Sequence, residues 1–141
     1  IQESEEPQER KQLDSGPSET QLDLIARGRE LRQRVFGALR SGGGASPAQE
    51  AHEKMIDSHY FGVLWSNTDL TLKQRCLVLL GIICGSNRMN GAEVWFAAGL
   101  RLGYQPAELE EVVLSAGVYC GELTYFGAQQ ALAEAIASQK P

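Results

Sequence analysis

The 141-residue chain lacks a long hydrophobic run and a cluster of basic residues, and these two absences exclude several classes of protein. Its longest apolar run, Cys76 to Cys84, is interrupted by Gly81 and falls short of the roughly 18 residues that a membrane-spanning helix requires. The net charge is -5, and no block of Lys and Arg offers a surface for nucleic-acid phosphates. We therefore expect a soluble protein with no affinity for membranes or nucleic acid.

Cysteine and histidine are also scarce. Cys76, Cys84 and Cys120 are too widely spaced for a zinc motif or a redox Cys-x-x-Cys pair, so we expect a reducing, cytoplasmic compartment. We expect Cys76 and Cys84, on an apolar segment, to be buried. The two histidines, His52 and His59, lack a third ligand and do not predict a metal site. No phosphate loop, nicotinamide fingerprint or nucleophile elbow is present, so we expect no cofactor.

The first 20 residues differ in composition from the rest of the chain. They are rich in Glu, Gln, Ser and Pro, which predicts a flexible acidic arm that is solvated or wraps a neighbouring subunit. The start at Ile1 leaves open whether a targeting segment has been removed. Residues 21–141 have the length of one domain with a single core.

The local signals in this domain are helical and predict an all-α fold, a compact bundle of about six helices. Three helix starts are marked by capping boxes: Ser18 to Gln21, Ser46 to Gln49 and Thr71 to Gln74. In chain order we expect a first helix that reaches Leu39 before the Ser41–Ala45 linker, a second from Pro47 to His59, a buried central helix over Cys76 to Cys84, a fourth from Asn90 to Gly103, a fifth that begins at Pro106, and a last helix over Ala128 to Ile136.

The helix that begins at Pro106 has the clearest amphipathic stripe. Its packing face is predicted to contain Leu109, Val112, Val113, Ala116, Gly117 and Cys120. The central helix, in contrast, is apolar nearly all round. A short helical domain has little means of covering such a helix alone, which weakly favours an oligomer.

Two blocks of sequence carry a family resemblance: His59-Tyr-Phe-Gly-Val-Leu-Trp65 and Leu114-Ser-Ala-Gly-Val-Tyr-Cys-Gly121. The resemblance extends through Gly28 to Gly37, Leu70 to Arg75 and Asn90 to Gly103. Over residues 22–137 the chain resembles the carboxymuconolactone decarboxylase family of the alkylhydroperoxidase D-like superfamily. The resemblance implies a small helical protein that assembles as a homotrimer or homohexamer, with pockets near the subunit contacts.

The chain departs from this family at its usual catalytic positions. In the peroxidase branch a Cys-x-x-Cys pair and a His occupy the positions that are Arg88, Gly91 and Trp95 here, so we do not expect a thiol peroxidase. In the decarboxylase branch a Glu and a His occupy the positions of Gly91 and Trp95, so the usual proton donor is absent. Trp95 either plugs the former pocket or offers an aromatic platform to a different substrate.

Other residues are therefore candidates for a reassigned site. His59 can exchange a proton near neutral pH, although a histidine at a helix end can also serve as a cap or packing residue. Arg75 matches a position that the family commonly fills with Arg; it is a candidate carboxylate anchor, or else a salt bridge or cap of the scaffold. Trp65 and Trp95 would form apolar walls around a substrate.

A second group of candidates flanks Gly121. Tyr119 and Cys120 match a Tyr-Cys-Gly block of the family, which has a Pro two residues later where this chain has Leu123. We consider both side chains as substrate-binding. Glu122 either pairs with His59 across the pocket and sets its protonation state, or simply favours the start of its helix.

These residues predict a cofactor-independent lyase or isomerase for a small acidic lactone, enol or polyketide-like metabolite. His59 would transfer a proton and Arg75 would hold an anionic oxygen. Decarboxylation follows most directly from the resemblance, and ring closure or isomerisation needs only a shaped pocket with one acid or base. The alternative is an oligomeric scaffold or small-ligand-binding protein that has lost the family's active site.

Overall fold

The computed structural model describes residues 19–37 and 46–139, and all regular structure in these ranges is helical. In chain order the helices are α1 (Glu19–Phe36), α2 (Pro47–Met55), the π-helix η2 (Ile56–Trp65), α3 (Leu72–Gly85), α4 (Ala92–Arg101), α5 (Pro106–Cys120) and α6 (Glu122–Ser138). The expected all-α fold is confirmed. The Ser41–Ala45 linker lies outside the described residues, as does the expected arm except for its last two residues, which begin α1.

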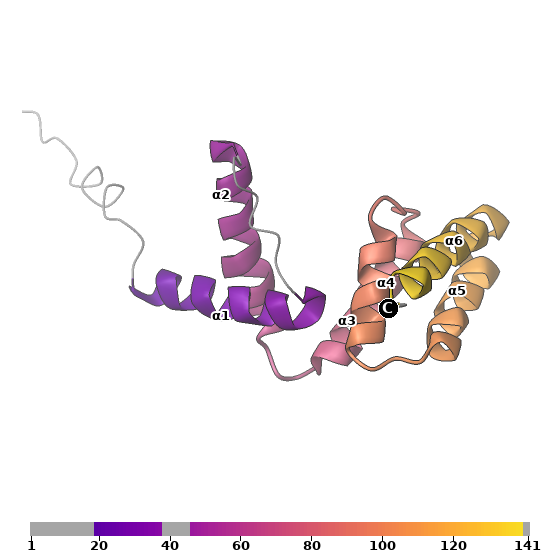
Figure 1. Ribbon diagram of the computed structural model, residues 1–141, viewed down its shortest axis with the longest axis horizontal. Helices are drawn as coiled ribbons and strands as arrows, with labels where there is room; N and C mark the ends of the chain where they lie inside the picture. Colours follow the sequence, from indigo (N-terminus) through magenta and orange to yellow (C-terminus); the bar gives the residue numbers. More distant parts are fainter. Residues whose placement is uncertain (1–18, 38–45, 140–141) are drawn as a thin grey trace, which may run out of the picture.

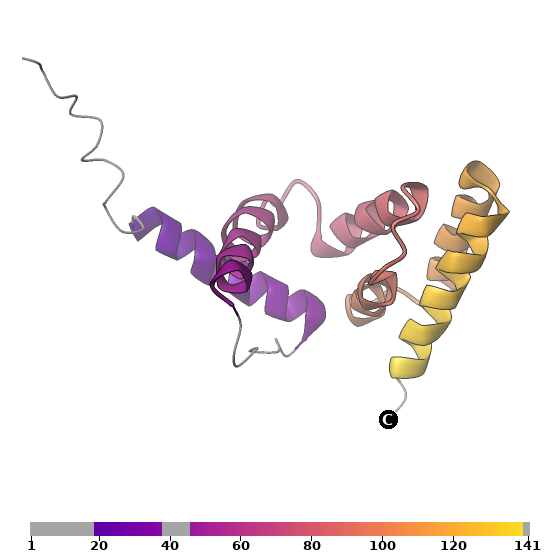
Figure 2. The same cartoon turned by 90° about the horizontal axis from the view of Figure 1, so that it is seen from above.

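The helices form two groups at opposite ends of the long axis of the molecule (Figure 1). At one end α1 crosses the long helix formed by α2 and η2, and at the other end α5 and α6 pack side by side. Seen from above, α4 lies between α1 and α6 and contacts both of them (Figure 2). No helix of the described ranges is long and apolar enough to cross a membrane.

Two of the predicted capping boxes and the glycine that follows α4 are confirmed. Ser46 and Thr71 each accept a hydrogen bond from the backbone N–H three residues later, and the glutamine there, Gln49 or Gln74, bonds back to the cap. Gly103 adopts a φ of 106°, the left-handed conformation expected after a helix. Ser18, the third predicted cap, lies outside the described residues.

Two predicted helix ends are wrong. The first helix ends at Phe36, because Gly37 has a φ of 81° and leaves the helical conformation. The second does not end at His59 but continues as η2 to Trp65. The reason lies outside the local sequence, since η2 is held by the burial of Phe61 and Trp65 and by its packing against α1.

The central helix α3 is buried on one face only. Cys76, Leu80 and Cys84 are fully buried, which confirms the expected burial of these two cysteines. On the opposite face Val78 is 53% and Ile82 58% exposed, so a single chain leaves part of this apolar helix uncovered. In α5, Leu109, Val113 and Ala116 are buried as predicted, whereas Cys120 is exposed because it is the last residue of the helix.

The crossing of α1 and η2 depends on two glycines. A Cβ atom on Gly28 would overlap the backbone carbonyl oxygen of Asp57, and one on Gly62 would lie 2.5 Å from the carbonyl oxygen of Leu24. The two helix backbones can therefore approach this closely only because neither position has a side chain.

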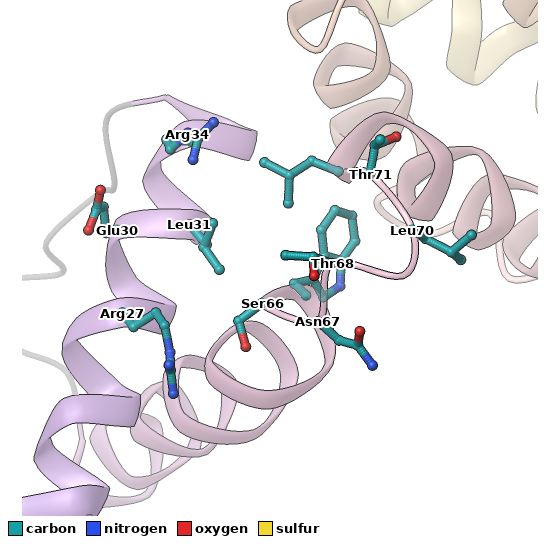
Figure 3. Close-up of a pocket in the computed structure, with 11 residues that line it drawn as sticks. Arg27, Glu30, Leu31, Arg34, Ser66, Asn67, Thr68, Leu70 and Thr71 are labelled. Atoms are coloured by element: carbon teal, nitrogen blue, oxygen red, sulfur yellow. The ribbon is translucent and has the colours of Figure 1, made fainter.

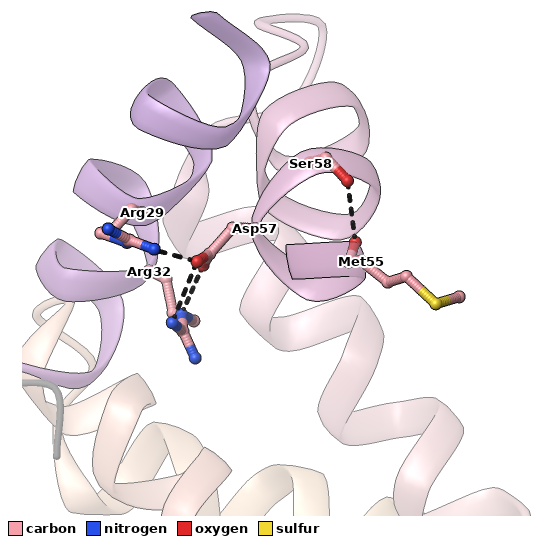
Figure 4. Close-up of polar contacts among 5 residues, drawn as sticks. All are labelled: Arg29, Arg32, Met55, Asp57 and Ser58. Carbon is pink, nitrogen blue, oxygen red and sulfur yellow. Dashed lines mark hydrogen bonds and ion pairs between the residues drawn. The ribbon is translucent and has the colours of Figure 1, made fainter. Parts of the chain in front are cut away.

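A buried ion pair connects the same two helices (Figure 4). The Asp57 side chain is fully buried, which no local sequence pattern predicted. Arg32 Nε lies 2.7 Å from Asp57 Oδ1, and Arg32 Nη2 donates a hydrogen bond of 3.2 Å to Oδ2. Arg29 Nε approaches Oδ2 at 3.4 Å from a more exposed position. These contacts fix which face α1 turns toward η2.

Candidate functional site

A cavity of about 460 Å³ lies between α1 and the segment that joins η2 to α3 (Figure 3). Its size is that of a small-molecule pocket. Figure 3 shows Leu31 pointing into the cavity from α1, with Arg27 and Arg34 on either side of it along the helix; Glu30 lines the cavity from the same helix. The opposite wall contains Trp65, Ser66, Asn67, Thr68, Leu70, Thr71 and Leu72.

The charged side chains that line this cavity are two arginines, Arg27 and Arg34, and one glutamate, Glu30, so the lining has an excess of one positive charge. Within the described ranges the ion pairs are those of Asp57 with Arg29 and Arg32, so Arg27 and Arg34 keep their positive charges unpaired there. Leu31 and the buried Trp65 provide apolar surface between the charged ends. The arrangement suits a small anion with an apolar body.

Arg75 lies outside the cavity and binds the backbone of one of its walls. Its Nε and Nη2 donate hydrogen bonds of 3.3 Å and 2.9 Å to the backbone oxygen of Asn67, which lines the cavity. Arg75 itself is not a lining residue. Through these two hydrogen bonds Arg75 holds the loop that forms this wall of the cavity.

The two tryptophans are brought together by the fold. The rings of Trp65 and Trp95 stack at 5.7 Å with an interplanar angle of 27°. Phe36 meets the Trp95 ring edge-on at 4.6 Å, and Phe61 stacks on Trp65 at 5.2 Å. Trp65 lines the cavity, whereas Trp95 packs behind it and is not a lining residue.

The structure does not bring His59 and Glu122 together within one chain. His59 is exposed on η2, where its Nδ1 lies 2.8 Å from the Ser58 hydroxyl oxygen. Glu122 is exposed at the start of α6, and η2 and α6 belong to opposite ends of the molecule (Figure 1). No ion pair within residues 19–37 and 46–139 joins the two side chains.

Tyr119 and Cys120 line a separate groove of about 440 Å³ between α3 and α5. The groove also contains Leu77 and Gly81 from α3, and Glu108 and Glu111 line it from α5. The predicted site residues are therefore divided between two places. Among the described residues no group of three His, Cys, Asp or Glu side chains could hold a metal ion.

Arg27 and Arg34 were not among the predicted site residues. A signal for them existed, because Arg27, Leu31 and Arg34 follow the i, i+4, i+7 spacing that places residues on one helix face. Two arginines on one face, separated by two helical turns and with a leucine between them, indicate a surface that is both cationic and apolar.

The fold and the cavity define a small helical protein with a pocket that two arginines line. No family model matches the chain. It is similar to nitrosuccinic acid decarboxylase npaB of Metarhizium robertsii, with 31% identity over 120 residues that cover 77% of this chain and 78% of that protein. The chain belongs to the family of this decarboxylase.

Proposed function

We propose that this protein is a decarboxylase-like lyase that acts on a small acid bound in the cavity between α1 and the η2–α3 segment. The observation that carries the proposal is the pair of unpaired arginines, Arg27 and Arg34, beside the apolar surface of Leu31 and Trp65. Membership of a decarboxylase's family supports the reaction class. The wider carboxymuconolactone decarboxylase-like family and the absence of a cofactor are parts of the same proposal.

The chemistry of decarboxylation explains why this cavity is suitable. The bond to the leaving carboxylate breaks, carbon dioxide departs, and the electron pair stays on carbon as an enolate or nitronate that then takes up one proton. Apolar surroundings disfavour the localised charge of the leaving carboxylate, and a guanidinium stabilises the delocalised anion. One arginine would hold a second anionic group of the substrate while the other faces the developing charge.

Nitrosuccinic acid is a suitable first substrate to test, together with lactone and enol acids. It has two carboxyl groups, and one of them is on the carbon that bears the nitro group. Loss of that carboxyl group leaves a nitronate, the kind of anion that an arginine can stabilise.

His59 is the proposed proton donor. Because it lies outside the cavity of its own chain, this role requires a neighbouring subunit to bring the imidazole to the bound substrate. Glu122 lies at the opposite end of the folded molecule from His59. The two side chains could therefore contact each other only across a subunit interface. Arg75 would act through the loop that it holds, and Trp95 through its stack on Trp65. We keep Tyr119 and Cys120 as proposed substrate contacts in the second groove.

Arg27→Gln and Arg34→Gln are each expected to lower kcat/KM for the acid about 10- to 100-fold, mainly through KM, because each removes a charge-assisted contact. The assay is product-resolved mass spectrometry with nitrosuccinic acid, γ-carboxymuconolactone and related enol acids. Arg88→Gln, an exposed arginine outside the cavity, is the matched control. His59→Ala should lower kcat for the same acid, because it removes the proposed proton donor.

Two results would count against this proposal. Turnover that is unchanged in both arginine variants would place the reaction elsewhere in the molecule. Complete lack of turnover with every acid would favour the alternative of a small-ligand-binding scaffold. That alternative is supported by Trp95, which replaces the family's proton donor and packs against Trp65 and Phe36.

We further propose that the protein is a homotrimer or homohexamer. Large apolar side chains remain exposed on α3, α5 and α6, among them Val78, Ile82, Val118, Leu123 and Phe126. Apolar surface of this extent is typical of a subunit contact.

Light scattering coupled to size exclusion should therefore give a mass of three or six chains. Ile82→Glu is expected to reduce this mass toward one chain, because it buries a charge in the contact. Leu22→Glu, which adds the same charge at an exposed leucine on α1, should leave the mass unchanged. A wild-type mass of one chain at micromolar concentration would contradict the proposal.

A further inference from the structure

Two of the three cysteines lie at the same end of neighbouring helices. Cys84 is in the last turn of α3, and Cys120 is the last residue of α5. The two helices contact each other and run in the same direction (Figure 1). A Cβ atom on Gly85, the residue after Cys84, would lie only 3.9 Å from Cys120 Sγ. The helix packing therefore brings the end of α3 up to the Cys120 thiol.

The two thiols differ in their surroundings. Cys84 is fully buried, and burial raises the pKa of its thiol; the neighbouring Cys120 raises it further. Cys120 is exposed at the end of the groove between α3 and α5. An oxidant from solvent therefore reaches Cys120 first. Cys84 is the second thiol of the pair, and its burial protects it from the oxidant.

The third cysteine, Cys76, is a buried thiol with which the reactivity of the other two can be compared. Cys76 is fully buried two helical turns before Cys84, where its Sγ donates a weak hydrogen bond of 3.7 Å to the backbone oxygen of Trp95. Burial raises the pKa of the Cys76 thiol to about 11. A thiol in this state is a poor nucleophile at neutral pH.

We infer that Cys84 and Cys120 form an oxidant-sensitive thiol pair that a hydroperoxide converts into a disulfide between α3 and α5. The Cys120 thiolate attacks one peroxide oxygen, the O–O bond breaks, and a sulfenic acid and water result when hydrogen peroxide is the oxidant. Cys84 Sγ then attacks the Cys120 sulfur and displaces hydroxide, which leaves as water with the Cys84 proton. In sum, two thiols and one hydrogen peroxide give one disulfide and two waters.

The backbone at this end of the groove can adjust to the bond. Cys120 is followed by Gly121, which has a φ of 104° and separates α5 from α6. Both cysteines are in terminal turns, where a shift breaks fewer hydrogen bonds than it would in mid-helix. Disulfide geometry is specific, so this freedom at the helix ends is what allows the two sulfur atoms to meet. The bond would join the two walls of the groove that Tyr119 lines.

The pair does not form the Cys-x-x-Cys centre of a thiol peroxidase. Its residues are 36 positions apart, on different helices, and the reaction consumes one equivalent of peroxide without turnover. The inference does not depend on the cavity that contains the arginines, although Cys120 is also a proposed substrate contact in the second groove.

The test is titration of the fully reduced full-length chain with hydrogen peroxide. We expect the intact mass to fall by two hydrogen atoms and two free thiols per chain to disappear. Trypsin should then release residues 76–88 linked to the peptide that contains Cys120, and fragmentation of this species should place the link at Cys84 and not at Cys76. The bond should be within one chain, so a non-reducing gel should show no new dimer.

Three variants make the outcome decisive. Cys76→Ala should form the disulfide as the wild type does. Cys84→Ser should instead gain oxygen atoms at Cys120, because the sulfenic acid has no second thiol to meet. Cys120→Ser should keep both remaining thiols. Wild-type chains that gain oxygen at Cys120 without losing two hydrogens, or that link Cys120 between chains, would overturn the inference, and neither result would bear on the binding of an acid between Arg27 and Arg34.

Discussion

Replacing Asp57 by Asn is expected to lower the free energy of unfolding by about 3–5 kcal/mol, the usual cost of removing one partner of a buried ion pair. The Asp57 side chain is fully buried and that of Arg32 is 16% exposed. The variant would leave the Arg32 guanidinium in this poorly solvated position without its counter-charge. Urea unfolding followed by far-UV circular dichroism measures the difference.

The matched control is Asp69→Asn, the same chemical change at an exposed carboxylate in the loop before α3. Its effect should stay within about 0.5 kcal/mol. Arg29→Gln is informative as well, since this side chain is 59% exposed and its pair with Asp57 is screened, so a loss of about 1 kcal/mol or less is expected. If Asp57→Asn were as stable as the Asp69 variant, the ion pair would not hold α1 against η2.

Gly28→Ala is expected to destabilise the protein by more than about 3 kcal/mol, beyond the usual cost of overpacking. The added methyl group would overlap the backbone carbonyl oxygen of Asp57, and a backbone atom cannot move aside as a side chain can. The helices must therefore separate, which also strains the ion pair between Asp57 and Arg32. The same unfolding experiment gives the free-energy change.

Gly81→Ala provides the control for this substitution. Gly81 is also a mid-helix glycine, but a Cβ atom there meets nothing within 4 Å. The change should leave stability unaltered or raise it by up to about 1 kcal/mol, because alanine restricts the unfolded chain more than glycine does. Equal effects of the two substitutions would show that the crossing tolerates a wider separation than the structure has.

The parts of the fold that the sequence predicted are those that local chemistry decides. Ser46, Thr71 and Gly103 mark helix ends through their own backbone contacts or conformation, within a few residues. The extension of the second helix as η2 was missed because it depends on α1, which is distant in sequence. Asp57 was missed for the same reason, since its partner Arg32 is 25 residues away.

The candidate site was predictable only in part. Trp65 was predicted to form a wall of the substrate pocket, and it lines the cavity that contains Arg27 and Arg34, hereafter the arginine cavity. Arg27 and Arg34 were overlooked because their spacing identifies a helix face without revealing what that face opposes. His59 and Glu122 were grouped by their chemistry. The sequence pattern alone could not show that they lie at opposite ends of the folded molecule.

The stack of Trp65 on Trp95 determines where the tryptophan fluorescence of the protein originates. The chain has two tryptophans in all, and both are in this stack. Its entire indole emission therefore originates beside the arginine cavity, from two rings close enough to share their excitation. Binding of an acid between Arg27 and Arg34 would therefore change the intrinsic tryptophan fluorescence, so binding could be followed without an attached dye.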